Sequence, residues 1–330
     1  MTDDLNRIKK YRKDLGSEQK IKELNDFLAR FEEKIYEESP APAYPLVFII
    51  GCPRTGSTLL AQLLAASGLF AYVSNFVARF WKAPVIGAKI GLALDLALMK
   101  NESNLKSSFG QTTGWTEPHE FGYFWDRWFK YEETAKVSPE TLAKIDQREM
   151  KSTFLSIQAA FGMPMFYKNQ NKYSLQTEFL ANLFENSYFI FIERQPLYQT
   201  QSVLLSRQEF CGSIHTWWTM KPAEYALLKN LSPYEQVAGQ THYLTADINR
   251  QLKKLPGKTY IRLNYEALCA APPQEVGKIM KHIGIETGAP LDKKAFKYLP
   301  EKLASGNIQK FSTTEWNKLK SACKKFGLLQ

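Results

Sequence analysis

The sequence has few of the residues that build metal sites and disulfide frameworks. Only four cysteines and four histidines occur among its 330 residues. The cysteines are widely separated and none forms a C-x-x-C pair, and the histidines are equally scattered. Neither a zinc site nor a disulfide framework is therefore predicted.

Long hydrophobic runs are also missing. Residues 1–20 are charged throughout and contain no apolar core of a signal peptide. The longest apolar stretch, residues 84–99, is short for a membrane-spanning helix and contains Lys89 and Asp95. A buried or pocket-lining helix explains it better. We therefore expect a cytoplasmic protein with no membrane span.

Acidic residues are outnumbered by basic ones. Lys and Arg total 43 against 33 Asp and Glu, which gives a formal net charge of +10. The excess is concentrated in residues 291–330, where nine lysines face three acidic residues. A basic chain favours anionic partners, which include phosphorylated or sulfated small molecules, nucleic acid and acidic membranes. Composition alone does not choose among them.

The pattern of apolar residues predicts an α/β fold. A continuous apolar run at residues 46–51 is typical of a strand buried on both faces, and a tight turn and a helix follow it. A second such unit has its strand at residues 187–193. Weaker strands are expected at residues 164–168 and 258–265. The sequence thus predicts a central parallel sheet flanked by helices.

No internal repeat and no clean interdomain linker is visible. We expect an N-terminal amphipathic helical segment in residues 1–40, whose apolar residues between Ile21 and Ile35 would pack on the main domain or on a dimer partner. Residues 41–330 would form a single α/β domain with a mainly helical insertion at residues 72–160.

The turn after the first strand has the outline of a P-loop-like phosphate-binding strand-loop-helix. Residues 51–58 read Gly-Cys-Pro-Arg-Thr-Gly-Ser-Thr. Backbone N–H groups in such a loop, together with the following helix N-terminus, attract an anion. A nucleoside triphosphatase has Lys after the second glycine, whereas this chain has Ser57 there and its cation, Arg54, inside the loop. The loop is therefore expected to bind phosphate, but it lacks the lysine that usually contacts a γ-phosphate.

A second pair of polar residues follows the strand at residues 187–193. Arg194 stands where that strand ends, and Ser202 lies on the next helix. A guanidinium at the carboxyl end of a strand and a hydroxyl on the following helix can hold another phosphate. Two anion sites on one sheet predict a ligand with two separated phosphates.

Three segments together resemble the PAPS-dependent sulfotransferases, where PAPS is 3′-phosphoadenosine 5′-phosphosulfate. They are PRTGSTLL after the first strand, FIERQPLYQTQS at the second, and LNYEAL further on. The loop is most similar to that of bacterial and carbohydrate-type members. The resemblance covers Gly51 to Leu268 and implies transfer of a sulfuryl group from PAPS to a hydroxyl or amine. PAP, the 3′,5′-bisphosphate, would be the product, and no metal would be required.

The resemblance also implies roles for individual residues. The 3′-phosphate would be bound by Arg194 and Ser202, and the adenine would lie beside Tyr265. Lys168 would be a second cation near the sulfuryl group, as is the strand-end lysine of many members, although Gln170 replaces the usual proline. The 5′-phosphosulfate would be held by the loop residues Arg54, Thr55, Gly56, Ser57 and Thr58.

Two departures from the family pattern concern the nucleotide. Leu59 stands where cytosolic members have a tryptophan that stacks on adenine. The late Arg-Lys-Gly element of those members has no clear match. Within residues 302–310, the turn Ser305-Gly306-Asn307 is the candidate to bring backbone N–H groups to the 3′-phosphate.

The sequence leaves the catalytic base open among three residues. His119 could act near neutral pH without a large pKa shift, whereas Glu117 or Glu120 would need a raised pKa. Carboxylates in a first helical turn also favour the helix dipole without any catalytic role. Trp115, Trp217 and Trp218 are candidates for an aromatic acceptor pocket. The stripe of five aromatic residues between Phe121 and Phe129 is more typical of a core.

Two other functions are compatible with parts of the sequence. A P-loop nucleotide kinase with a degenerate loop would bind ATP with Mg²⁺, but the missing lysine at Ser57 argues against it. A basic protein that binds nucleic acid or membrane through residues 291–330 would show a steep salt dependence, and no nucleic-acid motif supports it. We expect a small-molecule, lipid or carbohydrate acceptor, no nucleic-acid partner, and possible homodimer formation.

Overall fold

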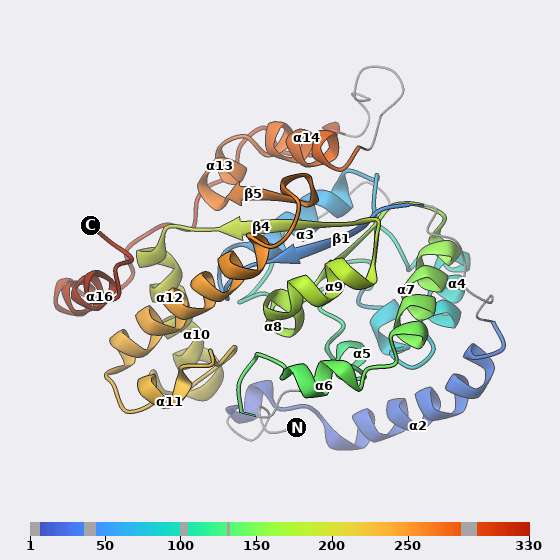
Figure 1. Cartoon of the computed structure of the whole chain (residues 1–330), viewed down its shortest axis with the longest axis horizontal. Coiled ribbons are helices and arrows are strands. Elements are labelled where there is room, and N and C mark those ends of the chain that lie inside the picture. Colours follow the sequence, from blue (N-terminus) through green and yellow to red (C-terminus); the bar gives the residue numbers. More distant parts are fainter. Residues whose placement is uncertain (1–6, 36–43, 100–104, 131–132, 285–295) are drawn as a thin grey trace.

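Five parallel strands form one sheet in the centre of the molecule (Figure 1). The computed structural model describes residues 7–35, 44–99, 105–130, 133–284 and 296–330. The strands, in spatial order, are β2 (Ala71–Tyr72), β3 (Met165–Lys168), β1 (Leu46–Ile50), β4 (Ser187–Glu193) and β5 (Tyr260–Asn264). The expected parallel sheet flanked by helices is confirmed.

Strand β1 lies in the middle because every one of its residues is apolar and buried. Leu46 is in register with Met165 of β3 on one side and with Ser187 of β4 on the other. The three strands therefore end at the same edge of the sheet. The chain leaves β1 toward β2 and leaves β4 toward β5, in opposite directions, and ligands bind at such a switch point in open α/β sheets.

Helices cover both faces of the sheet. The side chains of β1 point alternately to the two faces, and they are buried on both. Phe48 belongs to the core on one face and Val47 to the core on the other. The first face is covered by α7 (Gln147–Phe161), α9 (Thr177–Leu183) and α12 (Pro233–Leu252). The second is covered by α3 (Ser57–Ala66), α13 (Tyr265–Ala270) and α14 (Pro272–His282).

Further helices surround these layers. A third apolar cluster joins α10 (Pro196–Cys211) and α16 (Thr313–Lys325) to α12. The remaining short elements are η1 (Lys9–Tyr11), η2 (Val77–Arg79), α4 (Pro84–Ala93), α5 (Gly122–Trp125), α6 (Pro139–Ala143), α8 (Gln170–Tyr173), η3 (Ser174–Gln176), α11 (Tyr225–Leu228) and η4 (Gly257–Thr259). No helix of the described residues is long and apolar enough to cross a membrane.

The aromatic stripe forms core, as predicted. Phe124 and Trp125 are fully buried and pack against Phe154 of α7, with ring centroids 5.3 and 5.2 Å away. The stripe does not lie on one helix, however. Phe121 adopts a left-handed conformation, and α5 ends four residues later at Trp125.

The N-terminal helix α2 (Leu15–Glu32) follows the expected apolar stripe only in part: Ile21, and Ile35 just after the helix, pack against the core. Leu24 and Phe31 are exposed, whereas the polar Asn25 and Glu32 are buried. The Glu32 carboxylate accepts hydrogen bonds from the first backbone N–H groups of α4, at 2.6 and 3.0 Å. Asn25 accepts a hydrogen bond from the backbone N–H of Lys82 at 2.9 Å. Polar caps thus hold α2 in place.

Replacing Glu32 by alanine is expected to destabilise the fold. One buried and one partly buried N–H group of α4 would lose their acceptor, which costs about 1–3 kcal/mol for an unsatisfied buried group. Urea unfolding followed by circular dichroism measures the change. Glu33→Ala is the matched control because Glu33 is exposed. Equal unfolding midpoints for the two variants would contradict a capping role for Glu32.

Candidate active site

The turn between β1 and α3 forms a cradle of backbone N–H groups. Gly56 has φ 95°, and a Cβ atom there would lie 2.4 Å from Cδ2 of Tyr265. Only glycine therefore fits this position. Helix α3 begins directly afterwards, at Ser57, with no side chain capping its N-terminus. The positive end of the helix dipole faces the loop, where an anion would be stabilised.

Arg54 is held inside this loop. Its backbone is left-handed, with φ 69°, a conformation that only a few per cent of non-glycine residues adopt. Its Nε donates a hydrogen bond to Oγ of Ser202 at 3.0 Å, and its guanidinium lies over the ring of Phe109. Burial, with the nearby charge of Arg194, lowers the pKa of Arg54 to about 10, and Glu120 partly opposes this.

Arg194 follows β4 and points to the same loop. It donates to the carbonyl oxygens of Arg54 and Gly306, at 3.2 and 2.9 Å, and to Oδ1 of Asn307 at 2.7 Å. Burial lowers the pKa of Arg194. All three acceptors are neutral, and within the described residues neither arginine makes an ion pair. Two partly desolvated cations thus lie close together without a direct ion pair, although the charges of Glu120 and Glu266 act on them.

The late segment expected near the second phosphate lies beside Arg194. The hydroxyl of Tyr265 accepts a hydrogen bond from the backbone N–H of Gly306 at 2.9 Å, and the Tyr265 ring stacks under Arg194. The Glu266 carboxylate accepts a hydrogen bond from the Asn307 amide at 2.6 Å. These contacts fix the turn at residues 305–307 against Arg194 and the loop between β1 and α3.

At the carboxyl end of β3, Lys168 pairs with Glu120. The Lys168 side chain is only 1% exposed, and its Nζ lies 2.8 Å from Oε1 of Glu120. Burial opposes ionisation of this carboxyl group, but the charge and hydrogen bond of Lys168, with His119 and Arg54, outweigh burial. The pKa of Glu120 is therefore below its ordinary value. Glu120 is an ionised carboxylate that lines the pocket.

His119 lines the same pocket but is held in one tautomer. Its Nδ1 accepts a hydrogen bond from the backbone N–H of Phe121 at 2.8 Å. The residue has an exposed part, but desolvation by the surrounding protein lowers the pKa of His119 to about 4; the charge of Glu120 opposes this shift and that of Lys168 adds to it. At neutral pH the ring is uncharged and carries its proton on Nε2. It can donate a hydrogen bond from Nε2, whereas Nδ1, the nitrogen that could accept a proton, already accepts the N–H group of Phe121.

Glu117 lies elsewhere. It is 4% exposed, and its Oε2 accepts a hydrogen bond from Nε2 of Gln62 on α3 at 2.8 Å. It is not among the residues that line the pocket. This position suits a structural contact between α3 and the loop before α5, and gives Glu117 no access to a ligand in the pocket.

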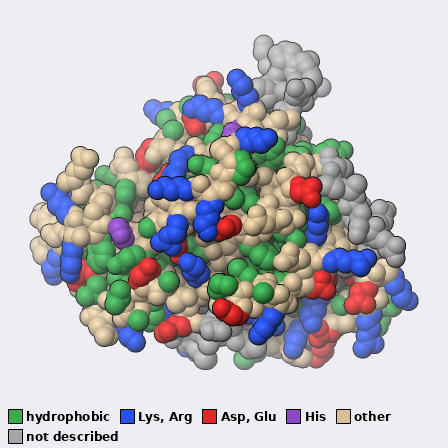
Figure 2. Space-filling model, viewed as in Figure 1, with side chains coloured by type: hydrophobic (Ala, Val, Ile, Leu, Met, Phe, Trp, Pro, Cys, Tyr) green, Lys and Arg blue, Asp and Glu red, His purple; other side chains and the backbone are tan. Residues whose placement is uncertain are grey.

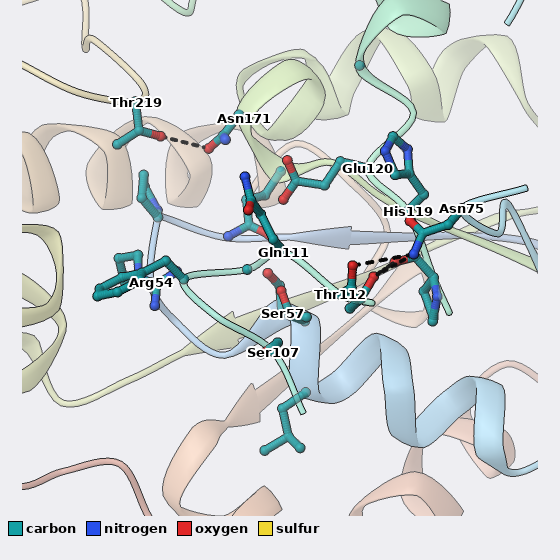
Figure 3. A pocket seen from close by; sticks show the side chains of 18 of the residues that line it. Arg54, Ser57, Asn75, Ser107, Gln111, Thr112, His119, Glu120, Asn171 and Thr219 are labelled. Atoms are coloured by element: carbon teal, nitrogen blue, oxygen red, sulfur yellow. Dashed lines mark hydrogen bonds between the residues drawn. The ribbon is translucent and has the colours of Figure 1, made fainter. Parts of the chain in front are cut away.

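These side chains surround one cavity of about 850 Å³. Figure 3 shows Arg54 on one side and His119 and Asn75 on the other, with Gln111 and Glu120 between them. Of the residues expected at the site, those that line the cavity are Arg54, Gly56, Ser57, Thr58, His119, Glu120, Arg194 and Tyr265. Thr55, Lys168 and Ser202 lie behind it. The hydroxyl of Thr55 donates to the carbonyl of Cys52, while Lys168 and Ser202 contact the wall residues Glu120 and Arg54.

Several lining residues were not identified from the sequence. Arg7 and Lys13 come from the N-terminal segment, and Arg79 comes from η2. Isolated basic residues on a charged chain give no sequence signal. Of the three expected tryptophans, Trp115 and Trp218 line the cavity. The third, Trp217, instead stacks on buried Arg207.

No group of three or more histidine, cysteine or acidic residues that could hold a metal ion occurs within the part of the chain that the structure describes. The polar groups of the cavity are instead cations, hydroxyls, amides and one carboxylate. Such a set can bind an anion and move a proton from a bound hydroxyl.

The sequence profile of the sulfotransferase family matches residues 45–289. A search among proteins of curated function found no similar sequence. Several solved structures share the fold, and two of them are bacterial sulfotransferases. Sulfotransferase STF9 from Mycobacterium avium is 13% identical, with a TM-score of 0.56 over 92% of this chain and 81% of that one. Sulfotransferase STF1 from Mycobacterium tuberculosis is 14% identical, with a TM-score of 0.57 over 92% and 82%. The family profile spans both strand-loop-helix units that build the cavity, and the protein therefore belongs to the sulfotransferase family.

Proposed function

We propose that the protein transfers a sulfuryl group from PAPS to a hydroxyl or amine acceptor by in-line displacement. The observation that carries this proposal is the pair Arg54 and Arg194. Both guanidiniums are buried in large part, face one loop and hydrogen-bond only to neutral oxygens within the described residues. A bisphosphorylated ligand would neutralise both charges, and hydrogen bonds between charged groups are among the strongest in proteins.

The donor would be held by two sets of groups. Arg54, the N–H groups of the loop and the hydroxyls of Ser57 and Thr58 would bind the 5′-phosphosulfate, with Thr55 fixing the loop from behind. Arg194, Ser202 and the turn at residues 305–307 would bind the 3′-phosphate, and Tyr265 would lie by the adenine. When bound, PAPS supplies an activated sulfuryl group whose leaving group is a phosphate.

Glu120 is our candidate for the general base. It is ionised, lines the pocket and is paired with Lys168. If Lys168 turns toward the sulfuryl oxygens when the donor binds, Glu120 loses its cation and its pKa rises. It would then become a better proton acceptor as the acceptor hydroxyl attacks. His119 would donate a hydrogen bond from Nε2 to hold that hydroxyl. Glu117 has no part in this proposal because it lies behind the wall.

Calorimetric titration with PAP, beside ATP with Mg²⁺, tests the donor directly. We expect PAP to bind and ATP not to bind, because Ser57 replaces the lysine that a nucleoside triphosphatase uses. ATP binding in place of PAP would favour a nucleotide kinase. Binding of neither nucleotide would contradict the donor that we propose.

Arg194→Ala is expected to weaken PAP selectively. PAP affinity should fall about tenfold or more, since one charge-assisted hydrogen bond contributes about 1.5–3 kcal/mol. Affinity for adenosine 5′-phosphate, which lacks the 3′-phosphate, should change much less. Arg148→Ala, at an exposed position on α7, is the matched control. Equal losses for the two nucleotides would remove Arg194 from the 3′-phosphate site.

A further inference from the structure

The cavity contains more positive charge than the proposed donor needs. Arg54 and Arg194 belong to the phosphate sites, but Arg7, Lys13 and Arg79 line the same cavity. Among the described residues, Glu120 is the one carboxylate in its lining. Binding of the proposed donor would not neutralise these three additional cations.

Two of the extra cations act on the acceptor side of the cavity. The segment before Arg79 is hydrogen-bonded to residues 117 and 119, and Lys13 lies over the ring of Tyr123; in agreement, both charges lower the pKa of His119. They are therefore close enough to His119 for an anion beside that ring to feel both charges. His119 lies across the cavity from Arg54 (Figure 3). The positive charge thus extends away from the phosphate-binding loop.

Of these cations, Arg79 is the best placed to bind an anion in the cavity. Asn25 of α2 donates a hydrogen bond to its carbonyl oxygen at 2.7 Å, which fixes its backbone. Its side chain is exposed to the cavity and makes no ion pair within the described ranges. Lys13, in contrast, already contacts Glu18 at 3.4 Å. A bound anion would therefore gain most from Arg79.

The neighbouring wall suits a polar ring compound. Asn75 donates hydrogen bonds from its side chain to the Gly114 carbonyl at 2.7 Å and to the Thr112 hydroxyl at 3.2 Å, which orders this wall. Trp115 lines the cavity with 56% of its surface exposed, and its ring meets that of Phe76 edge-on. An exposed indole beside ordered amides and hydroxyls offers both a stacking surface and hydrogen-bond partners.

The charge is a local property of the cavity and does not extend over the visible surface. Figure 2 shows Lys and Arg spread over one face of the molecule with Asp and Glu among them. The cavity, in contrast, is lined by five Lys and Arg residues against one acidic residue in the described chain. An anionic small molecule is therefore a better match to this feature than an extended anionic surface.

We propose that the acceptor is a hydroxyl compound that also carries an anionic group, a carboxylate, phosphate or sulfate, and that Arg79, assisted by Lys13, binds this group. The inference rests on the proposed function, because it takes Arg54 and Arg194 as the donor sites. The proposed cation site would also reduce an electrostatic repulsion. An anionic acceptor must approach an anionic donor, and cations on the acceptor side offset the repulsion between them.

The test compares two isosteric probes on protein saturated with PAP, so that the donor cations are occupied. The probes are 6-hydroxy-2-naphthoate and its neutral amide, and naphthol fluorescence reports their binding. We expect the acid to bind about tenfold more tightly than the amide at low salt, with a smaller ratio at high salt because Arg79 is exposed. Arg79→Gln should reduce the ratio to about threefold or less, with the affinity for PAP unchanged. Arg148→Gln removes the same charge outside the cavity and should leave the ratio as it is.

The outcomes separate the two proposals. If PAP binds and the wild-type protein holds acid and amide equally well, the anionic acceptor is wrong while the donor stands. The same holds if Arg79→Gln and Arg148→Gln give the same ratio as the wild type. If PAP fails to bind at all, the proposed donor is wrong, and the assignment of the acceptor side is overturned with it.

Discussion

Replacing Arg54 by alanine is expected to reduce kcat by about a thousandfold, the upper end of the effect of removing one group that stabilises transition-state charge. Arg54 lies in the phosphate-binding loop beside the N-terminus of α3, where charge would develop on the leaving phosphate. PAP affinity should also fall, by about 1.5–3 kcal/mol for the lost charge-assisted contact. Sulfated product measured by mass spectrometry, and PAP calorimetry, give the two effects separately.

Two further variants make this expectation specific. Arg54→Lys keeps the charge without the planar fork and should retain part of the activity. Ser202→Ala removes the hydroxyl that accepts from Arg54 Nε and should cost less than loss of the guanidinium itself. Near-normal turnover of Arg54→Ala, in protein that unfolds at the wild-type temperature, would remove Arg54 from the reaction.

Replacing Glu120 by glutamine is expected to reduce kcat by about 10²–10⁴-fold, the usual contribution of a general base. Glutamine keeps the size of the side chain and an oxygen that can accept from Lys168, so PAP affinity should change little. Glu117→Gln is the matched control, because the chemical change is the same and Glu117 contacts Gln62 outside the cavity.

The same assay also separates Glu120 from its neighbour. His119→Asn supplies another acceptor for the Phe121 N–H group and removes the Nε2–H donor. We expect a smaller loss of kcat than for Glu120→Gln. In the proposed arrangement His119 only donates a hydrogen bond and does not accept a proton. Full activity of Glu120→Gln beside an inactive His119→Asn would reverse the two roles.

The sequence predicted those parts of the fold that have a continuous apolar pattern. Strand β4 occupies the same residues, 187–193, that its apolar run indicates. Strand β2 was missed because it has only two residues, too few for any periodicity. The apolar stripe suggested hydrophobic packing, and Ile21 and Ile35 do pack on the core, but the fully buried residues of α2 are the polar Asn25 and Glu32. A polar residue on a charged helix gives no sign that it will cap another helix.

The sequence predicted some of the residues that line the cavity and missed others, because only residues at the ends of buried strands can be placed from an apolar pattern. Arg54 and Arg194 follow buried strands, and the ends of such strands can be located from sequence alone. Arg79 and Lys13 lie outside the sheet and reach the cavity only because α2 packs beside η2 and α4. The difference between Glu117 and Glu120 also depends on a loop conformation, since a few residues of irregular backbone decide which carboxylate faces the cavity.

The proposed donor and acceptor sides of the cavity come from different parts of the chain. Arg54 and Arg194 stand at the carboxyl ends of β1 and β4, in the most deeply buried framework. The opposite wall comes from loops at residues 107–122 and from the N-terminal segment around Lys13. We therefore expect that substitutions in that wall can accumulate without weakening the proposed nucleotide site. Proteins that evolve from this fold could therefore change their acceptor while they keep the same sulfuryl donor.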